Sequence, residues 1–215
     1  MIDITTRLCL RDPIPEIAEA ARTLDEAVSA HLRGDSASAA HLIRSTNTPI
    51  LRDFIESMWG ANSPHVRVRP VALPLPSNAP TEKVTQRMPS AAEKQALHDR
   101  DGYNCRFCGI PVIRKEVRVK IAAAYPTALP WGRQNALQHA AFQVLWAQYD
   151  HVVPHAHGGT NDPSNMVVAC AACNYARVAY TLEEVGLSDP RLREPVRSNW
   201  DGLERFTRVG GTSKH

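Results

Sequence analysis

Four of the five cysteines form two pairs with the spacing that zinc-binding proteins use. The pairs are Cys105–Cys108 and Cys170–Cys173, and each encloses two residues. Thiolates are preferred zinc ligands, and two such pairs supply the four ligands of a closed tetrahedral site. Because no position stays open for water, we predict a structural zinc. A redox-active dithiol and unrelated buried thiols are the alternatives, and the identical spacing favours zinc.

The two cysteine pairs are separated by 61 residues, which is long for a compact zinc site. Closing a loop of this length costs about 4 kcal/mol beyond a constant. Structural zinc binding contributes on the order of 10 kcal/mol or more. The separation is therefore compatible with one shared ion. The fifth cysteine, Cys9, is predicted to be an ordinary, partly buried thiol.

Polar residues suited to metal-assisted hydrolysis flank the second cysteine pair. Asp150 and His151 precede it, and Asn174 follows Cys173 directly. A carboxylate oxygen, a carboxamide oxygen and several waters are the ligands that magnesium prefers. A neutral imidazole can take a proton from water near pH 7. Together these groups provide what metal-assisted phosphodiester hydrolysis requires.

A strand, a loop, a second strand and a helix are predicted to position these side chains. Asp150 and His151 end the first strand, where a bend can turn both toward one cleft. Zinc would fix Asn174 on the first turn of the helix, and helix N-termini attract phosphate. The expected elements are a strand over 148–153, a loop over 155–164, a strand over 166–168 and a helix from 171 to about 178.

The N-terminal part, residues 1–60, is predicted to be helical. Apolar residues recur at helical spacing after Asp12-Pro13 and stop at Gly34. A second helix is expected over 37–44, and a third between Thr48-Pro49 and Gly60. We interpret this region as a packing or dimerisation element, so a homodimer formed through these helices is one expectation.

Residues 61–89 are rich in proline and are predicted to be a linker. Residues 65–69 alternate as a short strand would, and a surface linker is favoured over a DNA-contacting arm. Ser90 and Glu93 form a capping box that starts a helix ending near 100. Trp200 and Leu203, in the C-terminal tail over 188–215, are expected to dock on the core.

The segment between the cysteine pairs contains a predicted helical insertion over 109–148. One helix is expected over 114–124, and another over 133–147. This insertion could serve substrate choice, assembly or packing. The inner face of the second helix would consist of Leu137, Ala140, Ala141, Val144 and Leu145.

Composition limits the possible function classes only loosely. The chain has 215 residues, a net charge of +3 and 43% hydrophobic residues, which is ordinary for a globular protein. A mildly basic charge is compatible with nucleic acid but does not argue for it. The longest uncharged run, 134–149, contains Gln, Asn and His, so no membrane span is expected. No secretory signal is recognised at the N-terminus, and cysteines at metal-binding spacing suit a reducing compartment. We therefore expect a cytoplasmic protein.

The stretch from Asp150 to Asn174 resembles the HNH, or ββα-metal, nuclease motif in its zinc-knuckle form. The resemblance covers about 89–180 and includes the two cysteine pairs, Gly158-Gly159 and the polar residues described above. It implies an α+β fold, in which a ββα-metal core with a four-cysteine zinc site, over 90–187, is joined to the N-terminal helical region. The implied activity is hydrolysis of DNA, ahead of RNA.

The resemblance also implies roles for individual residues. His151 would be the general base, and Asn165 would brace the loop and orient the histidine. Asp150 and Asn174 would hold one divalent metal. Because the third signature position is Asn174 and not His, magnesium or manganese is favoured. The products would carry 5′-phosphate and 3′-hydroxyl ends.

Several basic residues are candidates for contacting nucleic acid. The resemblance suggests Arg177 as a phosphate contact, and His155 and His157 lie in the loop. The remaining basic candidates are the insertion residues Arg114, Lys115 and Arg118 and the tail residues Arg191, Arg193 and Arg197.

A catalytically inactive, zinc-stabilised module that binds nucleic acid or protein is the alternative to the nuclease.

Overall fold

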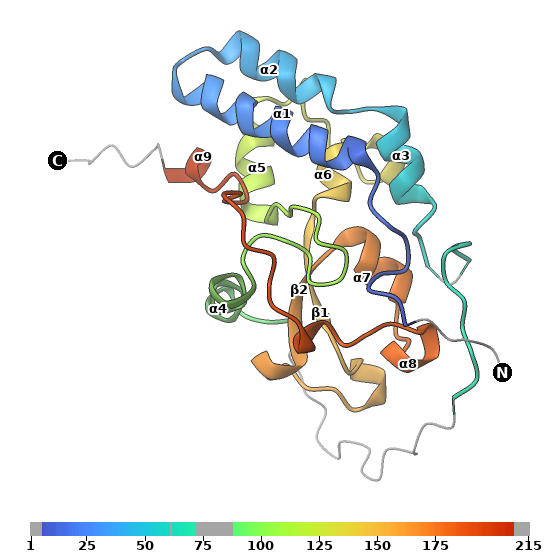
Figure 1. The fold of residues 1–215 in the computed structure, drawn as a ribbon. Helices are drawn as coiled ribbons and strands as arrows, with labels where there is room; N and C mark the ends of the chain where they lie inside the picture. Colours follow the sequence, from blue (N-terminus) through green and yellow to red (C-terminus); the bar gives the residue numbers. More distant parts are fainter. Residues whose placement is uncertain (1–5, 61, 72–87, 209–215) are drawn as a thin grey trace.

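The computed structural model describes residues 6–60, 62–71 and 88–208. Its N-terminal helices lie together at one end of the molecule (Figure 1). The first helix starts at Pro15, later than the Asp12-Pro13 start that the sequence predicts. Its N-cap, Ile14, makes no side-chain cap because its side chain is apolar. Pro15 takes the first-turn position, where a missing N–H costs nothing. The three helices are α1 (Pro15–Leu32), α2 (Ser36–Ser45) and α3 (Pro49–Glu56).

The insertion contains α5 (Lys115–Ala124) and α6 (Ala140–Val144). The predicted second helix over 133–147 is wrong in its first half, where only a short 3₁₀ turn, Asn135–Leu137, is present. Arg52 of α3 explains the interruption, because its guanidinium donates hydrogen bonds to the backbone carbonyls of Asn135 and Gln138. Leu137 is exposed as a result, whereas the other four predicted inner-face residues are buried.

The N-terminal helices share a hydrophobic core with the insertion. α1 and α3 pack against α6, and α9 (Arg205–Arg208) packs against α1 and α5. The apolar faces of these helices are thus covered by the same chain, and the structure gives no support for a homodimer formed through them. Leu203 is fully buried and Trp200 Nε1 donates to the carbonyl of Val112 (2.9 Å), so the tail docks on the core as predicted.

A two-stranded antiparallel hairpin with one helix forms the other end of the molecule (Figure 1). β1 (Ala147–His151) pairs with β2 (Met166–Cys170), so that Ala147 lies opposite Cys170 and His151 opposite Met166. α7 (Ala171–Arg177) packs against both strands. This ββα unit with added helices confirms the predicted α+β fold.

α4 (Ala91–Asp101) starts at the predicted capping box of Ser90 and Glu93. It lies along the edge of β2 that faces away from β1, where Arg100 donates to the carbonyl of Met166 (2.6 Å). The Asp101 carboxylate accepts a hydrogen bond from the backbone N–H of Val168 (3.0 Å). α4 therefore protects the free edge of the hairpin.

The segment 62–71 lies beside α8 (Leu182–Val185) and forms no strand, in contrast to the short strand predicted over 65–69. Arg69 donates from its backbone to the carbonyl of Glu184 (2.9 Å) and from its side chain to the carbonyl of Glu183 (2.6 Å). The rest of the predicted linker, 72–87, lies outside the described residues.

Within the described part of the chain, no helix is both long and apolar enough to cross a membrane.

Candidate active site

The four paired cysteines converge on one point, as their spacing predicts. Their sulfur atoms all lie within 4.8 Å of one another, and the Sγ atoms of Cys108 and Cys170 are 3.7 Å apart. A tetrahedral zinc ion with Zn–S bonds of about 2.3 Å requires sulfur atoms about 3.8 Å apart. Both the donor set and its dimensions therefore fit a closed site for a metal such as zinc.

The cysteine cluster joins three separate parts of the chain. Cys105 and Cys108 lie in a tight turn after α4, where Gly109 N donates to the carbonyl of Cys105 (2.9 Å). Cys170 ends β2, and Cys173 lies in the first turn of α7. Burial raises the pKa of the Cys170 thiol, so a bound cation is needed to stabilise the thiolates. An ion at this point would fix the start of α7 against β2.

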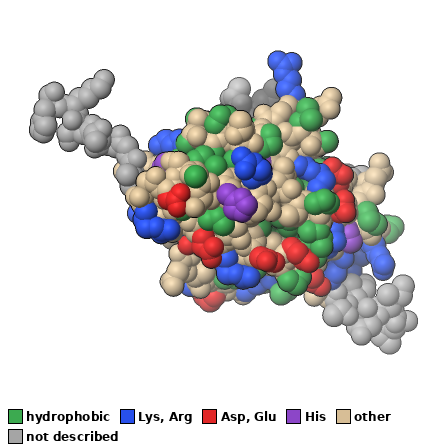
Figure 2. All heavy atoms as spheres, turned by 90° about the horizontal axis from the view of Figure 1, so that it is seen from above, with side chains coloured by type: hydrophobic (Ala, Val, Ile, Leu, Met, Phe, Trp, Pro, Cys, Tyr) green, Lys and Arg blue, Asp and Glu red, His purple; other side chains and the backbone are tan. Residues whose placement is uncertain are grey.

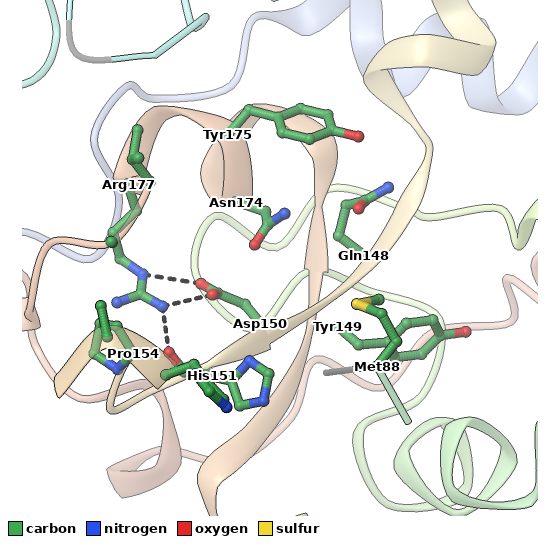
Figure 3. Close-up of a pocket in the computed structure, with 13 residues that line it drawn as sticks. Met88, Gln148, Tyr149, Asp150, His151, Pro154, Asn174, Tyr175 and Arg177 are labelled. Carbon is green, nitrogen blue, oxygen red and sulfur yellow. Dashed lines mark hydrogen bonds and ion pairs between the residues drawn. The ribbon is translucent and has the colours of Figure 1, made fainter. Parts of the chain in front are cut away.

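Asp150, His151 and Asn174 line one cleft of about 470 Å³ beside the hairpin. Asp150 and His151 come from the end of β1, and Asn174 comes from α7. Figure 3 shows the Asn174 side chain pointing toward the Asp150 carboxylate. His155 from the loop and Tyr175 from α7 complete part of the wall. The structure thus brings together the three residues that the sequence suggested for hydrolysis.

His151 is held by a loop residue that the sequence analysis missed. Its Nε2 atom lies 2.8 Å from Oδ1 of Asn161. Because an amide oxygen can only accept a hydrogen bond, Nε2 carries the proton and Nδ1 has the free lone pair. Within the described residues, Nδ1 makes no hydrogen bond, so this atom could accept a proton from a water molecule in the cleft.

Asn165 braces the loop through three hydrogen bonds to the backbone. Its side chain accepts from Val153 N (2.8 Å) and donates to the carbonyls of Val153 (3.0 Å) and Thr160 (2.9 Å). The expected contact with His151 is made by Asn161 instead. No feature of the sequence marked Asn161, since an asparagine after Gly-Gly-Thr is an ordinary loop residue.

Arg177 belongs to the wall of the cleft, but its side chain is buried and its charge is used within the protein, which argues against the predicted phosphate contact. Its side chain is only 1% exposed. Nε donates to Asp150 Oδ2 (2.9 Å), and Nη2 donates to Asp150 Oδ1 and to the carbonyl of His151 (Figure 3). Burial raises the pKa of the Asp150 carboxyl above its usual value, against the opposing effect of the Arg177 charge. Arg177 is therefore a partner of Asp150.

The loop over 152–165 is too tight for a side chain at one of its two adjacent glycines. A Cβ atom on Gly159 would lie 1.8 Å from the carbonyl oxygen of Val153. Gly158 has a φ of +83° but nothing within 4 Å of such an atom. Gly159 thus permits the close backbone contact that Asn165 secures, whereas Gly158 supplies a left-handed turn.

The other predicted nucleic-acid contacts fall in different environments. Arg118 is 5% exposed, and its guanidinium carbon stacks 3.6 Å from the centre of the Trp131 ring, so the structure contradicts its predicted role. Arg114 pairs with Glu204, whereas Lys115 is exposed. His155 lines the cleft, and His157 is half-buried outside it. Of the loop and insertion candidates, Lys115 is exposed and His155 lines the cleft, while the tail residues Arg191 and Arg197 are also exposed.

Comparison with known proteins gives one match, to the hairpin and its helix. Residues 143–177 match the family model described as HNH endonuclease. The matched segment contains β1, the braced loop, β2 and α7, and with them the cleft residues and the second cysteine pair. No curated protein and no solved structure matches the chain. The family match confirms the predicted resemblance and implies nucleic acid as the binding partner.

Proposed function

We propose that this chain, through its HNH endonuclease domain, hydrolyses phosphodiester bonds of DNA with the help of a divalent metal. The supporting observation is the single cleft lined by Asp150, His151 and Asn174. The cleft then contains a general base, oxygen ligands for a metal ion and space for a phosphate group. The four-cysteine cluster holds the structural zinc that keeps α7, and with it Asn174, in place.

His151 acts as the general base. Its unprotonated Nδ1 takes a proton from the attacking water, while the hydrogen bond from Nε2 to Asn161 stabilises the imidazolium that results. Asn165 acts indirectly, because it fixes the loop that contains Asn161. Asn161 and Asn165 are thus positioning residues, and His151 is the catalytic one.

The oxygen atoms of Asp150 and Asn174 are the ligands for the catalytic ion, and magnesium or manganese suits them. The Asp150 carboxylate has about four acceptor positions, of which Arg177 uses two. The remaining positions and the Asn174 carboxamide are hard donors of the kind that Mg²⁺ prefers. When bound, such an ion polarises the phosphate and stabilises charge on the leaving 3′ oxygen.

A catalytically inactive binding module is the second candidate. The ion pair of Arg177 with both carboxylate oxygens favours it, because the pair neutralises Asp150 without a metal. Such a protein would keep the zinc-stabilised fold and bind nucleic acid without cleaving it. The two candidates differ in whether a divalent ion converts binding into hydrolysis.

The experiment is a cleavage assay on purified protein with supercoiled plasmid, single-stranded DNA and structured RNA as substrates. We expect nicking of DNA in magnesium or manganese, with 5′-phosphate and 3′-hydroxyl ends. Cleavage restricted to the RNA substrate would point to an RNA-directed nuclease. A failure to cleave any substrate with magnesium, manganese or nickel would favour the binding module.

A further inference from the structure

A groove of about 490 Å³ lined mainly by arginines lies along the free edge of β2. Its walls come from α4, the first cysteine turn and the C-terminal segment over 190–197. Five arginines line it against two acidic residues, Asp101 and Glu194. We call it the arginine groove, and its arginines are Arg100, Arg106, Arg191, Arg193 and Arg197.

Two of these arginines serve the fold. Arg106 is 8% exposed and donates to the carbonyls of Pro190 and Arg193. Arg193 donates in turn to the carbonyls of Arg106 and Phe107. These bonds attach the C-terminal segment to the first cysteine turn. They account for Arg106 and Arg193, and Arg100 also contributes to the fold through its hydrogen bond to the carbonyl of Met166.

The remaining arginines reach the surface, and two of them are also paired with carboxylates. Arg100 pairs with Asp101 (2.8 Å), and Arg191 pairs with Asp189 (2.6 Å). The side chains of Arg100 and Arg191 are 41% and 40% exposed. Arg197 is exposed and uses one of its five donors within the described residues, in a hydrogen bond to the carbonyl of Arg100 (3.1 Å). Charges placed side by side at a rim match an anion with repeated charges better than a single small anion.

The arginine groove borders the same loop as the catalytic cleft. Arg100 Nη1 donates to the carbonyl of Pro163 (2.6 Å), and Arg191 Nη1 donates to the carbonyl of Ser164 (3.2 Å). Asn161, which holds His151, lies in the same loop. A polyanionic strand that crosses this loop can therefore contact the groove and the cleft together.

We propose that the arginine groove binds the phosphate backbone of the nucleic acid on one side of the cleaved bond. This inference rests on the proposed function, since it places the substrate of the same cleft. Figure 2, which views the helical end of the molecule, shows basic and acidic side chains interspersed over α1 and α2.

The test measures equilibrium binding to a fluorescent 20-base-pair duplex across a range of salt concentrations, in the His151→Ala background and without added divalent metal. Arg191→Gln with Arg197→Gln is the test pair. Arg22→Gln with Arg44→Gln is the control pair, because both residues are exposed on the helical end. We expect the test pair to weaken binding about tenfold or more and to flatten the salt slope by about 1.8, at 0.9 per phosphate contact.

Substitution of the same two positions by lysine separates a charge contact from a structural role. Lysine keeps the charge but lacks the guanidinium fork, so a phosphate contact should be largely restored. The inference is overturned if the glutamine pair binds as tightly as the control pair, or if lysine fails to restore binding to a protein that melts normally.

Cleavage by the wild-type protein, measured in parallel, distinguishes the two proposals. Cleavage without any effect of the glutamine pair on binding refutes the groove and leaves the nuclease intact. Groove-dependent binding without cleavage supports the groove and refutes the nuclease. If the duplex is neither bound nor cut, the groove proposal fails as well.

Discussion

The Asp150 carboxylate and the Arg177 guanidinium form a buried, bidentate ion pair that joins β1 to α7. Arg177 also donates to the carbonyls of His151 and Tyr180, so its side chain connects the end of β1 with the turn that follows α7. This arrangement sets the direction of Asp150 in the cleft. The Arg177 charge also lies next to Asp150, the candidate metal ligand, so a bound metal ion would have to overcome its repulsion.

Arg177→Gln should destabilise the protein strongly, because it leaves the Asp150 charge buried without a partner. Breaking a buried pair in this way costs about 3 to 5 kcal/mol. Urea unfolding of the variant measures this loss. The control is Arg191→Gln, which removes an exposed pair with Asp189 and should cost about 1 kcal/mol or less. Equal stability of the two variants would contradict the structural role of Arg177.

Loss of one zinc ligand should unfold the hairpin end of the molecule. Cys108→Ser removes a cluster ligand, and Cys9→Ser removes a buried thiol outside the group of four. We expect about one zinc per wild-type chain by elemental analysis and a melting temperature lowered by about 10 °C or more in Cys108→Ser. Cys9→Ser should keep its zinc. A full zinc content in Cys108→Ser would show that the ion is bound elsewhere.

The two adjacent loop glycines should respond differently to alanine. Gly159→Ala places a methyl group against the Val153 carbonyl, so the loop has to move and the Asn165 contacts are lost. Gly158→Ala meets no atom and bears only the cost of a left-handed backbone, about 1 kcal/mol. Thermal melting and nicking rates of both variants provide the test. A Gly159→Ala protein with normal activity would contradict the described loop.

The buried His139 predicts a loss of stability in acid. Desolvation lowers its pKa to about 4, and its Nδ1 is buried without a hydrogen-bond partner, while Nε2 donates to the carbonyl of Ile43 (3.0 Å). The folded state thus binds the proton more weakly than the unfolded chain, whose histidine titrates near 6.5. The effect of His139 on the free energy of unfolding is therefore absent above pH 6.5, and the protein loses about 3 kcal/mol of stability as the pH falls toward 4.

The measurement for His139 is the free energy of unfolding in urea at pH 7, 5.5 and 4.5, compared with His139→Gln. The variant should lose less stability than the wild type across this range, because glutamine does not titrate. Carboxyl groups affect both proteins alike and cancel in the comparison. Parallel curves for the two proteins would show that His139 does not control the acid response.

Sequence patterns were sufficient where the chemistry is local. The cysteine spacing predicted the four-sulfur cluster, and the capping box at Ser90 predicted the start of α4. The strands expected over 148–153 and 166–168 correspond to β1 and β2. Each of these signals depends on residues that are neighbours in the sequence.

The wrong predictions depend on partners that are distant in the sequence. Arg52 interrupts the expected helix over 133–147 from more than eighty positions away. Arg177 becomes buried only because Asp150 lies on the adjacent strand, and Arg118 because two tryptophans cover it. A Lys or Arg in a sequence pattern suggests a phosphate contact, but tertiary packing decides whether its charge reaches solvent.

The central claim is that His151 activates water in a cleft that holds a hard divalent ion. The direct measurement is the single-turnover rate of plasmid nicking in magnesium or manganese, for wild-type protein and His151→Ala at equal zinc content. We predict a fall of at least about 100-fold in His151→Ala, and of about tenfold in Asn161→Ala, which loses the hydrogen bond that orients His151. Unchanged nicking by a folded, zinc-loaded His151→Ala protein would contradict the account.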